Sequence, residues 1–219
     1  MHNKIGYYYL LILLLCAFNF FKVNSYSLPL KGKTIYIDPG HGGVDCGTKY
    51  KDILEKDINL ELSYLLKHSL ENKGAKVYMT RYDDYDLSSI GASRRKKSDF
   101  DNRIKLINNS DADMYISIHL NYIDSSIWSG VQIFYDDINS NNNKLASSIQ
   151  NMFNNNRKIS IIKDKYMYKR INKVGVLAEL GFLSNSTDRS ILLDDKKRDD
   201  VINKVTEGII NYYKDNLTK

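Results

Sequence analysis

The chain has 219 residues, of which 42% are hydrophobic and 26% are charged, a balance typical of a globular protein and inconsistent with wholesale disorder. Its formal net charge of +6 suits an anionic partner, such as nucleic acid, anionic lipid or a wall polymer. The sequence contains no RNA-binding, zinc-finger or basic-zipper motif, so we expect no nucleic-acid partner.

The N-terminal segment is typical of an exported protein. A basic start precedes an apolar stretch over residues 7–21, and a Val-x-Ser cleavage site ends at Ser25. The stretch is shorter than the roughly 20 apolar residues that span a bilayer. We therefore predict that residues 1–25 are a signal peptide or, alternatively, an uncleaved N-terminal membrane anchor, the only part that would contact a membrane. Cleavage would remove Cys16 and leave Cys46 alone, which excludes an intramolecular disulfide.

Strands and helices alternate in the rest of the chain. Short β-branched runs predict the strands, and apolar residues at helical spacing predict the helices. In chain order we predict a strand over 33–38, a helix over 55–73, a strand over 76–80, a helix over 99–109, strands over 114–120 and 130–135, a helix over 143–154, a strand over 174–180 and a closing helix over 198–215. This alternation predicts a single α/β domain whose largely parallel sheet is flanked by helices on both faces.

Three of the predicted strands end in residues that can bind metals or move protons. His41 follows the first strand, His119 lies at the end of the buried strand over 114–120, and Glu179 ends the late strand. Because the carboxyl ends of parallel strands meet at one edge of a sheet, we expect His41 and His119 to share a site. Two imidazoles suit Zn²⁺. His68 lies beside the apolar face of a helix, where a structural role is the simpler interpretation.

A catalytic zinc ion needs a third protein ligand beside the two histidines and a position for water. Glu55, at the start of a predicted helix, is a candidate, and so are Asp45, Asp52 and Asp57. Cys46 is a further candidate as a thiolate, although a small buried residue in a glycine-rich loop is the simpler interpretation. The residues alone leave this choice open.

Glu179 is placed to act as a general base. It follows the apolar run over residues 174–178, and a carboxylate in a water-poor site has a raised pKa. A structural salt bridge with Arg81 or Lys173 is the alternative. The sequence has neither a His-Glu-x-x-His motif nor a Gly-x-Ser-x-Gly elbow, which argues against a helix-borne zinc protease and a serine hydrolase. A two-carboxylate glycosidase would leave the paired histidines unexplained.

A series of motifs runs along the chain. In order, they are Asp38-Pro39-Gly40-His41-Gly42-Gly43, Asp45-x-Gly47, Glu55-Lys56, Thr80-Arg81, Arg103 with Asn108, Ala112-Asp113, Ser117-Ile118-His119-Leu120-Asn121 and Glu179-Leu180-Gly181-Phe182-Leu183-Ser184-Asn185. Together they resemble the motifs of the zinc-dependent N-acetylmuramoyl-L-alanine amidases (the Amidase_3 family). The resemblance covers residues 33–215, which we predict to be the catalytic domain. The chain departs from the family at Val174-Gly175, where relatives often carry Pro-Ala, and at Ile107, where relatives often carry Ala.

The resemblance implies a fold, a site and a reaction. The fold is a six-stranded mixed sheet flanked by helices. The site is one Zn²⁺ per chain, bound by His41, Glu55 and His119, with Glu179 as the catalytic carboxylate. The substrate is peptidoglycan, and the bond hydrolysed is the amide between N-acetylmuramic acid and the L-alanine of the stem peptide. Glu55 is chosen over the nearby aspartates by the resemblance and not by spacing.

The chain shows no added wall-binding module and resembles the sporulation-linked amidases that prepare spore-cortex peptidoglycan for muramic-δ-lactam formation and so for germination. This implies an exported protein, in the cell wall or the intermembrane space of the forespore. Without a targeting module, we expect an accessory protein that docks on the enzyme and activates it. The alternatives are a zinc hydrolase of another peptide or acyl amide, and a catalytically silent wall-binding module. The filled positions His41, Glu55, His119 and Glu179 disfavour the silent module.

Overall fold

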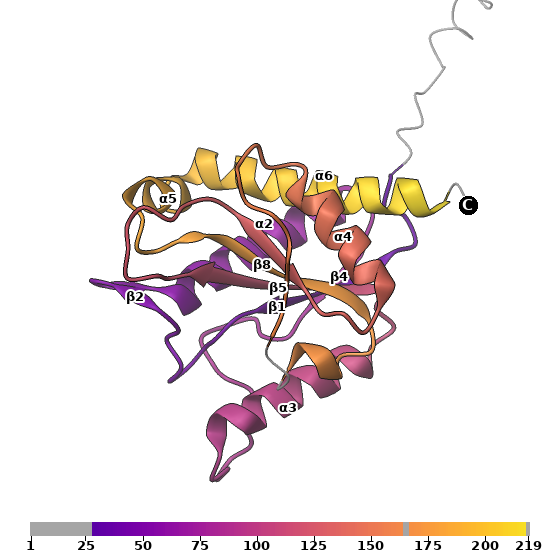
Figure 1. Ribbon diagram of the computed structural model, residues 1–219. Helices are drawn as coiled ribbons and strands as arrows, with labels where there is room; N and C mark the ends of the chain where they lie inside the picture. The colour runs from indigo at the N-terminus through magenta and orange to yellow at the C-terminus, as the bar shows by residue number, and fades with distance from the viewer. Residues whose placement is uncertain (1–27, 164–166, 218–219) are drawn as a thin grey trace, which may run out of the picture.

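One six-stranded mixed sheet lies at the centre of the computed structural model, which describes residues 28–163 and 167–217 (Figure 1). The strands, in spatial order, are β4 (Lys76–Met79), β1 (Thr34–Pro39), β5 (Met114–Asn121), β8 (Val174–Phe182), β6 (Gln132–Tyr135) and β7 (Ser160–Ile161). The first four run parallel to one another, β6 is antiparallel to β8, and β7 is parallel to β6. The predicted mixed, mostly parallel sheet is therefore confirmed. The predicted export segment, residues 1–25, lies outside the described residues.

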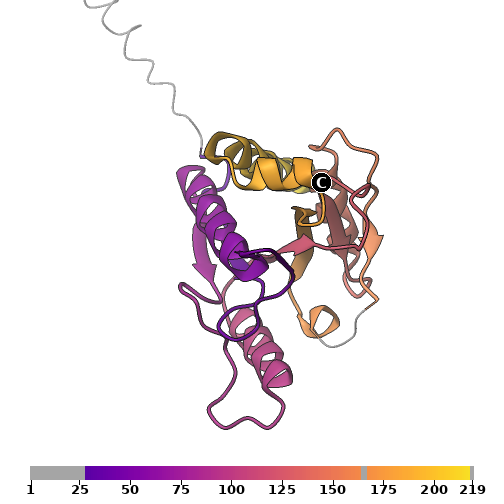
Figure 2. The same ribbon diagram turned by 90° about the vertical axis from the view of Figure 1, so that its left-hand side faces the viewer.

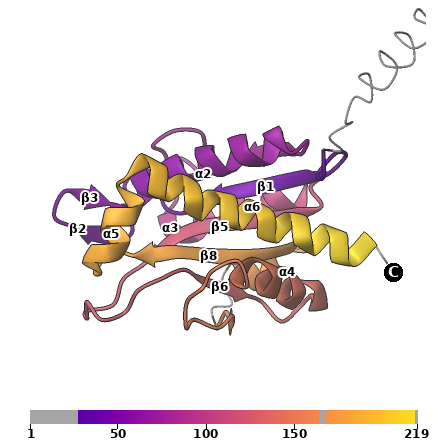
Figure 3. The same ribbon diagram turned by 90° about the horizontal axis from the view of Figure 1, so that it is seen from above.

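Helices cover both faces of this sheet, as the sequence predicts. On one face lie α2 (Glu55–Asn72), α4 (Ser140–Gln150) and α6 (Asp195–Leu217), and Figure 3 shows the long helix α6 lying over the central strands. On the other face lie α3 (Arg95–Asn108) and the short 3-10 helix η1 (Tyr168–Arg170), as Figures 1 and 2 show for α3. None of the helices within the described ranges is both long enough and apolar enough to cross a bilayer.

The alternation of side chains along each strand decides which residues can form a site. In β5, Ile116 and Ile118 enter the large core under α2, α4 and α6. Tyr115 enters the smaller core under α3. Because successive side chains of a strand point to opposite faces, Ser117 and His119 lie on the α3 face with Tyr115. The same alternation sets the orientation of the side chains of β8.

Boundaries differ from the prediction where the sequence gives no clear signal. α3 begins at Arg95, four residues before the expected 99, because its first turn is basic and apolar periodicity starts only later. α4 spans Ser140–Gln150 instead of 143–154, with the Asn139 side chain accepting from the Asn141 amide at its start. The sequence did not predict the short elements β7 and η1. It also did not predict β2 (Lys49–Tyr50), β3 (Ile53–Leu54) and α5 (Ser186–Leu192).

Candidate active site

The loop after β1 carries His41 in a backbone conformation that few side chains adopt. Its φ angle is 62°, in the left-handed region. Two buried arginines hold this loop: Arg103 Nη2 donates to the His41 carbonyl at 2.7 Å, and Arg81 Nη2 donates to the Gly40 carbonyl at 3.0 Å. A side chain at Gly40 would collide with His119, because a Cβ there would lie 2.3 Å from the imidazole. The loop therefore brings His41 close to the end of β5.

Glu55 is held rigidly at the start of α2. The β2–β3 hairpin leads directly into this helix, and the Glu55 side chain is buried. Its Oε2 atom accepts from the Thr48 amide at 2.8 Å and the Thr48 hydroxyl at 2.9 Å. Its Oε1 atom accepts from the Leu120 amide at 3.1 Å. The carboxylate is therefore fixed between the hairpin and β5.

Donor atoms of His41, Glu55 and His119 converge on one point. His41 Nε2 lies 3.2 Å from Glu55 Oε1, and His119 Nδ1 lies 3.1 Å from the same oxygen. One ligand atom from each residue lies within 4.8 Å of the other two. A tetrahedral zinc ion with ligands at about 2.0–2.1 Å places those ligands about 3.3 Å apart. The spacing and the two-nitrogen, one-oxygen donor set therefore fit a metal ion.

The electrostatics of this cluster also favour a cation. Burial alone would lower the pKa of His41, but the carboxylates of Asp45 and Glu55 outweigh it and raise this pKa to about 9. The Glu55 carboxylate thus creates a negative potential between the two imidazoles, where either protons or a metal ion can be bound.

The other candidates for a third ligand lie elsewhere. Asp45 Oδ2 is 3.1 Å from His41 Nδ1, the ring nitrogen that faces away from Glu55. Asp52 and Asp57 are exposed, as is His68 on α2. Cys46 is half-buried, not fully buried as its simpler interpretation supposed, and its thiol donates to the Gly47 carbonyl at 3.3 Å.

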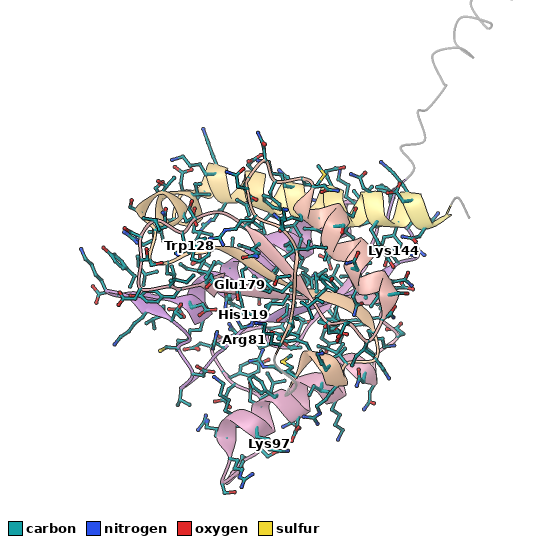
Figure 4. All side chains as sticks on the ribbon, in the orientation of Figure 1. Arg81, Lys97, His119, Trp128, Lys144 and Glu179 are labelled. Atoms are coloured by element: carbon teal, nitrogen blue, oxygen red, sulfur yellow. The ribbon has the colours of Figure 1, made fainter. Side chains whose placement is uncertain are left out.

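Glu179 faces the same site from β8. The register pairs it with His119, so both side chains lie on the α3 face of the sheet. Figure 4 shows these two labelled residues next to each other. It lines a cavity of about 290 Å³ together with His41, His119 and Tyr168. Its Oε2 atom is inaccessible and has no hydrogen-bond partner among the described residues. Burial, followed by the charge of Glu55, raises the pKa of Glu179 to about 8, although His41 opposes the shift.

The alternative interpretation of Glu179, a salt bridge with Arg81 or Lys173, does not match the contacts. Arg81 donates to the carbonyls of Pro39, Gly40, Lys56 and Asp83. Lys173 Nζ donates to the Ser110 carbonyl at 3.0 Å. Among the described residues, a carboxylate oxygen without a hydrogen-bond partner, Glu179 Oε2, therefore faces the three converging donors.

Comparison with known proteins identifies the family. Residues 35–211 match the family model of N-acetylmuramoyl-L-alanine amidase. The chain belongs to this amidase family. It is 42% identical over 216 residues to the germination-specific N-acetylmuramoyl-L-alanine amidase of Bacillus subtilis, an alignment that covers 94% of this chain and 91% of that relative.

Solved structures of similar amidases support the same family assignment. One is the CwlD amidase from Clostridioides difficile in complex with the GerS lipoprotein, with a TM-score of 0.79 and 34% identity over 84% of this chain and 99% of that one. Another is the catalytic domain of CwlV from Bacillus (Paenibacillus) polymyxa var. colistinus, with a TM-score of 0.71 and 25% identity over 83% and 98% of the two chains. The protein is thus an amidase of the N-acetylmuramoyl-L-alanine bond, and peptidoglycan is its substrate class.

Sequence reasoning missed the groups that support the amidase site. Asp38, buried at the end of β1, accepts from Thr80 Oγ1 at 2.6 Å and from Arg103 Nη1 at 2.7 Å. The hydroxyl oxygen of Tyr168, in η1, lies 3.4 Å from His119 Nε2. Asp38 had a sequence signal, because it opens the motif Asp38-Pro39-Gly40-His41. Tyr168 had none, because it lies 49 residues from His119 and outside every recognised motif.

Proposed function

We propose that this chain is a zinc-dependent amidase of the germination-specific type, with a catalytic domain over residues 33–215. It would cleave the amide between N-acetylmuramic acid and L-alanine in spore-cortex peptidoglycan, the step that prepares the glycan for muramic-δ-lactam formation. The observation that carries the chemistry is the convergence of three donor atoms opposite the unpaired Glu179 carboxylate. The likeness to the Bacillus subtilis germination-specific amidase supports the role in the spore.

We infer that His41, Glu55 and His119 bind one Zn²⁺ per chain. Two imidazole nitrogens and one carboxylate oxygen are a donor set that catalytic zinc uses, with a fourth position left for water. When bound there, zinc would lower the pKa of a water molecule and polarise the scissile carbonyl. The residues around the donors keep them in place: Thr48 and Leu120 hold the Glu55 carboxylate, and Arg103 holds the His41 backbone.

Glu179 is the proposed general base and then the general acid. Its carboxylate would take a proton from the water that attacks the carbonyl carbon. It would return this proton to the amide nitrogen as the carbon–nitrogen bond breaks, which releases an L-alanine amino terminus. Without a metal ion, burial raises the pKa of Glu179 to about 8. The positive charge of a bound zinc ion would lower this pKa towards neutral pH, where the group can both accept and release a proton.

The proposed setting is outside the cytoplasm, in the cell wall or the forespore intermembrane space, with residues 1–25 as a signal peptide or membrane anchor. An accessory protein that docks on the enzyme and activates it belongs to this proposal. The solved complex of a similar amidase with a lipoprotein supports such a partner.

Product analysis tests this function. Purified residues 26–219, loaded with zinc, would be incubated with cortex peptidoglycan and with soluble muropeptides, and the products identified by mass spectrometry. We expect free stem peptides that begin with L-alanine. Soluble muropeptides need no wall targeting, so muropeptides left intact by the zinc-loaded protein would mean that it requires the proposed activator or cleaves another amide. Cleavage at another amide would contradict the substrate.

A further inference from the structure

The two ring nitrogens of His119 have different surroundings. Nδ1 faces the Glu55 carboxylate at 3.1 Å, whereas Nε2 faces the Tyr168 hydroxyl at 3.4 Å. A neutral imidazole carries one proton, so only one of its nitrogens can offer a lone pair to a metal. The position of that proton therefore decides whether Nδ1 can act as a ligand.

Hydrogen bonds beyond Tyr168 lead to a buried carboxylate. The Tyr168 hydroxyl lies 3.3 Å from Ser117 Oγ, which lies 2.8 Å from Asp38 Oδ2. Asp38 is ion-paired with Arg103 at 2.7 Å. Burial alone would raise the pKa of Asp38, but Arg103 and the hydrogen bonds of Thr80 and Ser117 outweigh it and lower this pKa. Asp38 is thus an ionised group that can only accept hydrogen bonds.

The direction of each hydrogen bond follows from that carboxylate. Ser117 must donate its single hydroxyl proton to Asp38, so between Ser117 and Tyr168 the tyrosine is the donor. Tyr168 has then used its own proton and can only accept from His119. We propose that Asp38, Ser117 and Tyr168 form a hydroxyl relay that keeps the proton of His119 on Nε2 and leaves Nδ1 as the metal ligand. This inference rests on the proposed metal site.

Burial keeps the relay in one arrangement. Asp38, Ser117 and Tyr168 are 1%, 0% and 8% exposed, so water cannot readily replace their hydrogen bonds. Burial, followed by the charge of Asp38, raises the pKa of the Tyr168 hydroxyl far above its usual range, so this hydroxyl keeps its proton. The same Arg103 that pairs with Asp38 donates to the His41 carbonyl at 2.7 Å. One buried ion pair therefore supports both histidines, and the relay residues are positioning residues.

Tyr168→Phe tests the relay, because it removes the hydroxyl and keeps the ring. We expect the zinc affinity to fall about 10- to 100-fold, the usual cost of losing a group that orients a ligand. Ring-nitrogen NMR should show that zinc shifts Nδ1 of His119 in the wild type while Nε2 keeps its proton. In Tyr168→Phe that proton should exchange faster with water. Tyr115→Phe is the matched control, because the Tyr115 hydroxyl is buried in the same small core but faces Asp136 and takes no part in the relay.

Ser117→Ala tests the connection to Asp38 while leaving Tyr168 in place. If both residues act through one relay, the double variant should bind zinc no more weakly than the weaker single variant. Zinc affinity within twofold of the wild type in Tyr168→Phe, or loss of the Nε2 proton when zinc binds the wild type, would overturn the relay alone. Wild-type protein that binds no zinc would instead overturn the proposed metal site.

Discussion

The proton-transfer role of Glu179 can be tested by a substitution that barely changes the shape of the side chain. Glu179→Gln keeps the size of the side chain but cannot take a proton, so we expect turnover to fall about 10²- to 10⁴-fold. The bound zinc should remain at one per chain, because Glu179 is not among the three converging donors. Glu61→Gln, an exposed carboxylate on α2, is the control and should leave turnover unchanged. A Glu179 variant within threefold of the wild type would refute the assigned role.

Glu179 should also make the metal-free protein sensitive to pH. Its pKa is about 8 in the folded protein against an ordinary value of 4.5. Between these values the folded state binds more protons than the unfolded state, so the free energy of unfolding falls as pH rises. The contribution has an upper limit of about 1.4 kcal/mol per pH unit.

Urea unfolding at pH 5 and pH 8, with a chelator present, measures this effect. Glu179→Gln lacks the titration, so its stability relative to the wild type should increase between the two pH values. A constant difference between the two proteins would show that the carboxyl ionises without such a cost.

From the sequence, the positions of site residues could be predicted where those residues lie at the ends of strands. His41, His119 and Glu179 could be placed at one edge because parallel strands deliver their carboxyl ends together. Glu55 could not be separated from Asp45 by reasoning on the residues, because its position depends on a hairpin of two-residue strands. The resemblance to the amidases made that choice.

Among the elements, α4 and α6 pack tightly against each other at Gly208. A Cβ at this position would lie 2.5 Å from the Cα of Ile149, and Ser148 Oγ donates to the Gly208 carbonyl at 2.7 Å. We expect Gly208→Ala to destabilise the protein by about 1–3 kcal/mol, because overpacking outweighs the better helix propensity of alanine.

The matched control for Gly208→Ala is Asn203→Ala on the exposed side of α6, which should stabilise slightly through helix propensity alone. Urea unfolding of both variants provides the comparison. If both substitutions changed the free energy of unfolding by the same amount in the same direction, the two helices could separate at Gly208 without cost.

Long periodic elements were predicted well, and short capped ones were not. The pattern of α6 placed Ile202, Val205 and Ile209 in the core, where they lie. α5 has only seven residues, and its start is set by Asn185, whose side chain accepts from the amides of Thr187 and Asp188. Such a helix depends on its cap and on tertiary contacts, so apolar periodicity does not reveal it.

At the scale of the whole molecule, the converging donors connect three separate segments: the loop after β1, the start of α2 and the end of β5. A metal ion that binds only the folded arrangement should stabilise the entire fold. With free zinc at 100 times its dissociation constant, we expect the free energy of unfolding to rise by about 2.7 kcal/mol.

His119→Ala should lose most of this stabilisation and most of the bound zinc, because one donor is missing. His68→Ala removes an exposed histidine on α2 and should keep both. Equal stabilisation of the two variants by zinc would mean that the ion binds elsewhere.

The strand order also dictates a sequence of assembly. β8 is the last strand in the chain, yet it lies between β5 and β6, both of which are synthesised earlier. β6 therefore cannot join the sheet until β8 inserts, and the pairing of β8 with β5 sets Glu179 beside His119. The carboxylate proposed to move the proton is thus among the last side chains to reach its place. A chain still emerging from the ribosome has no complete site, so the ability to cut the wall is acquired only when the fold is closed.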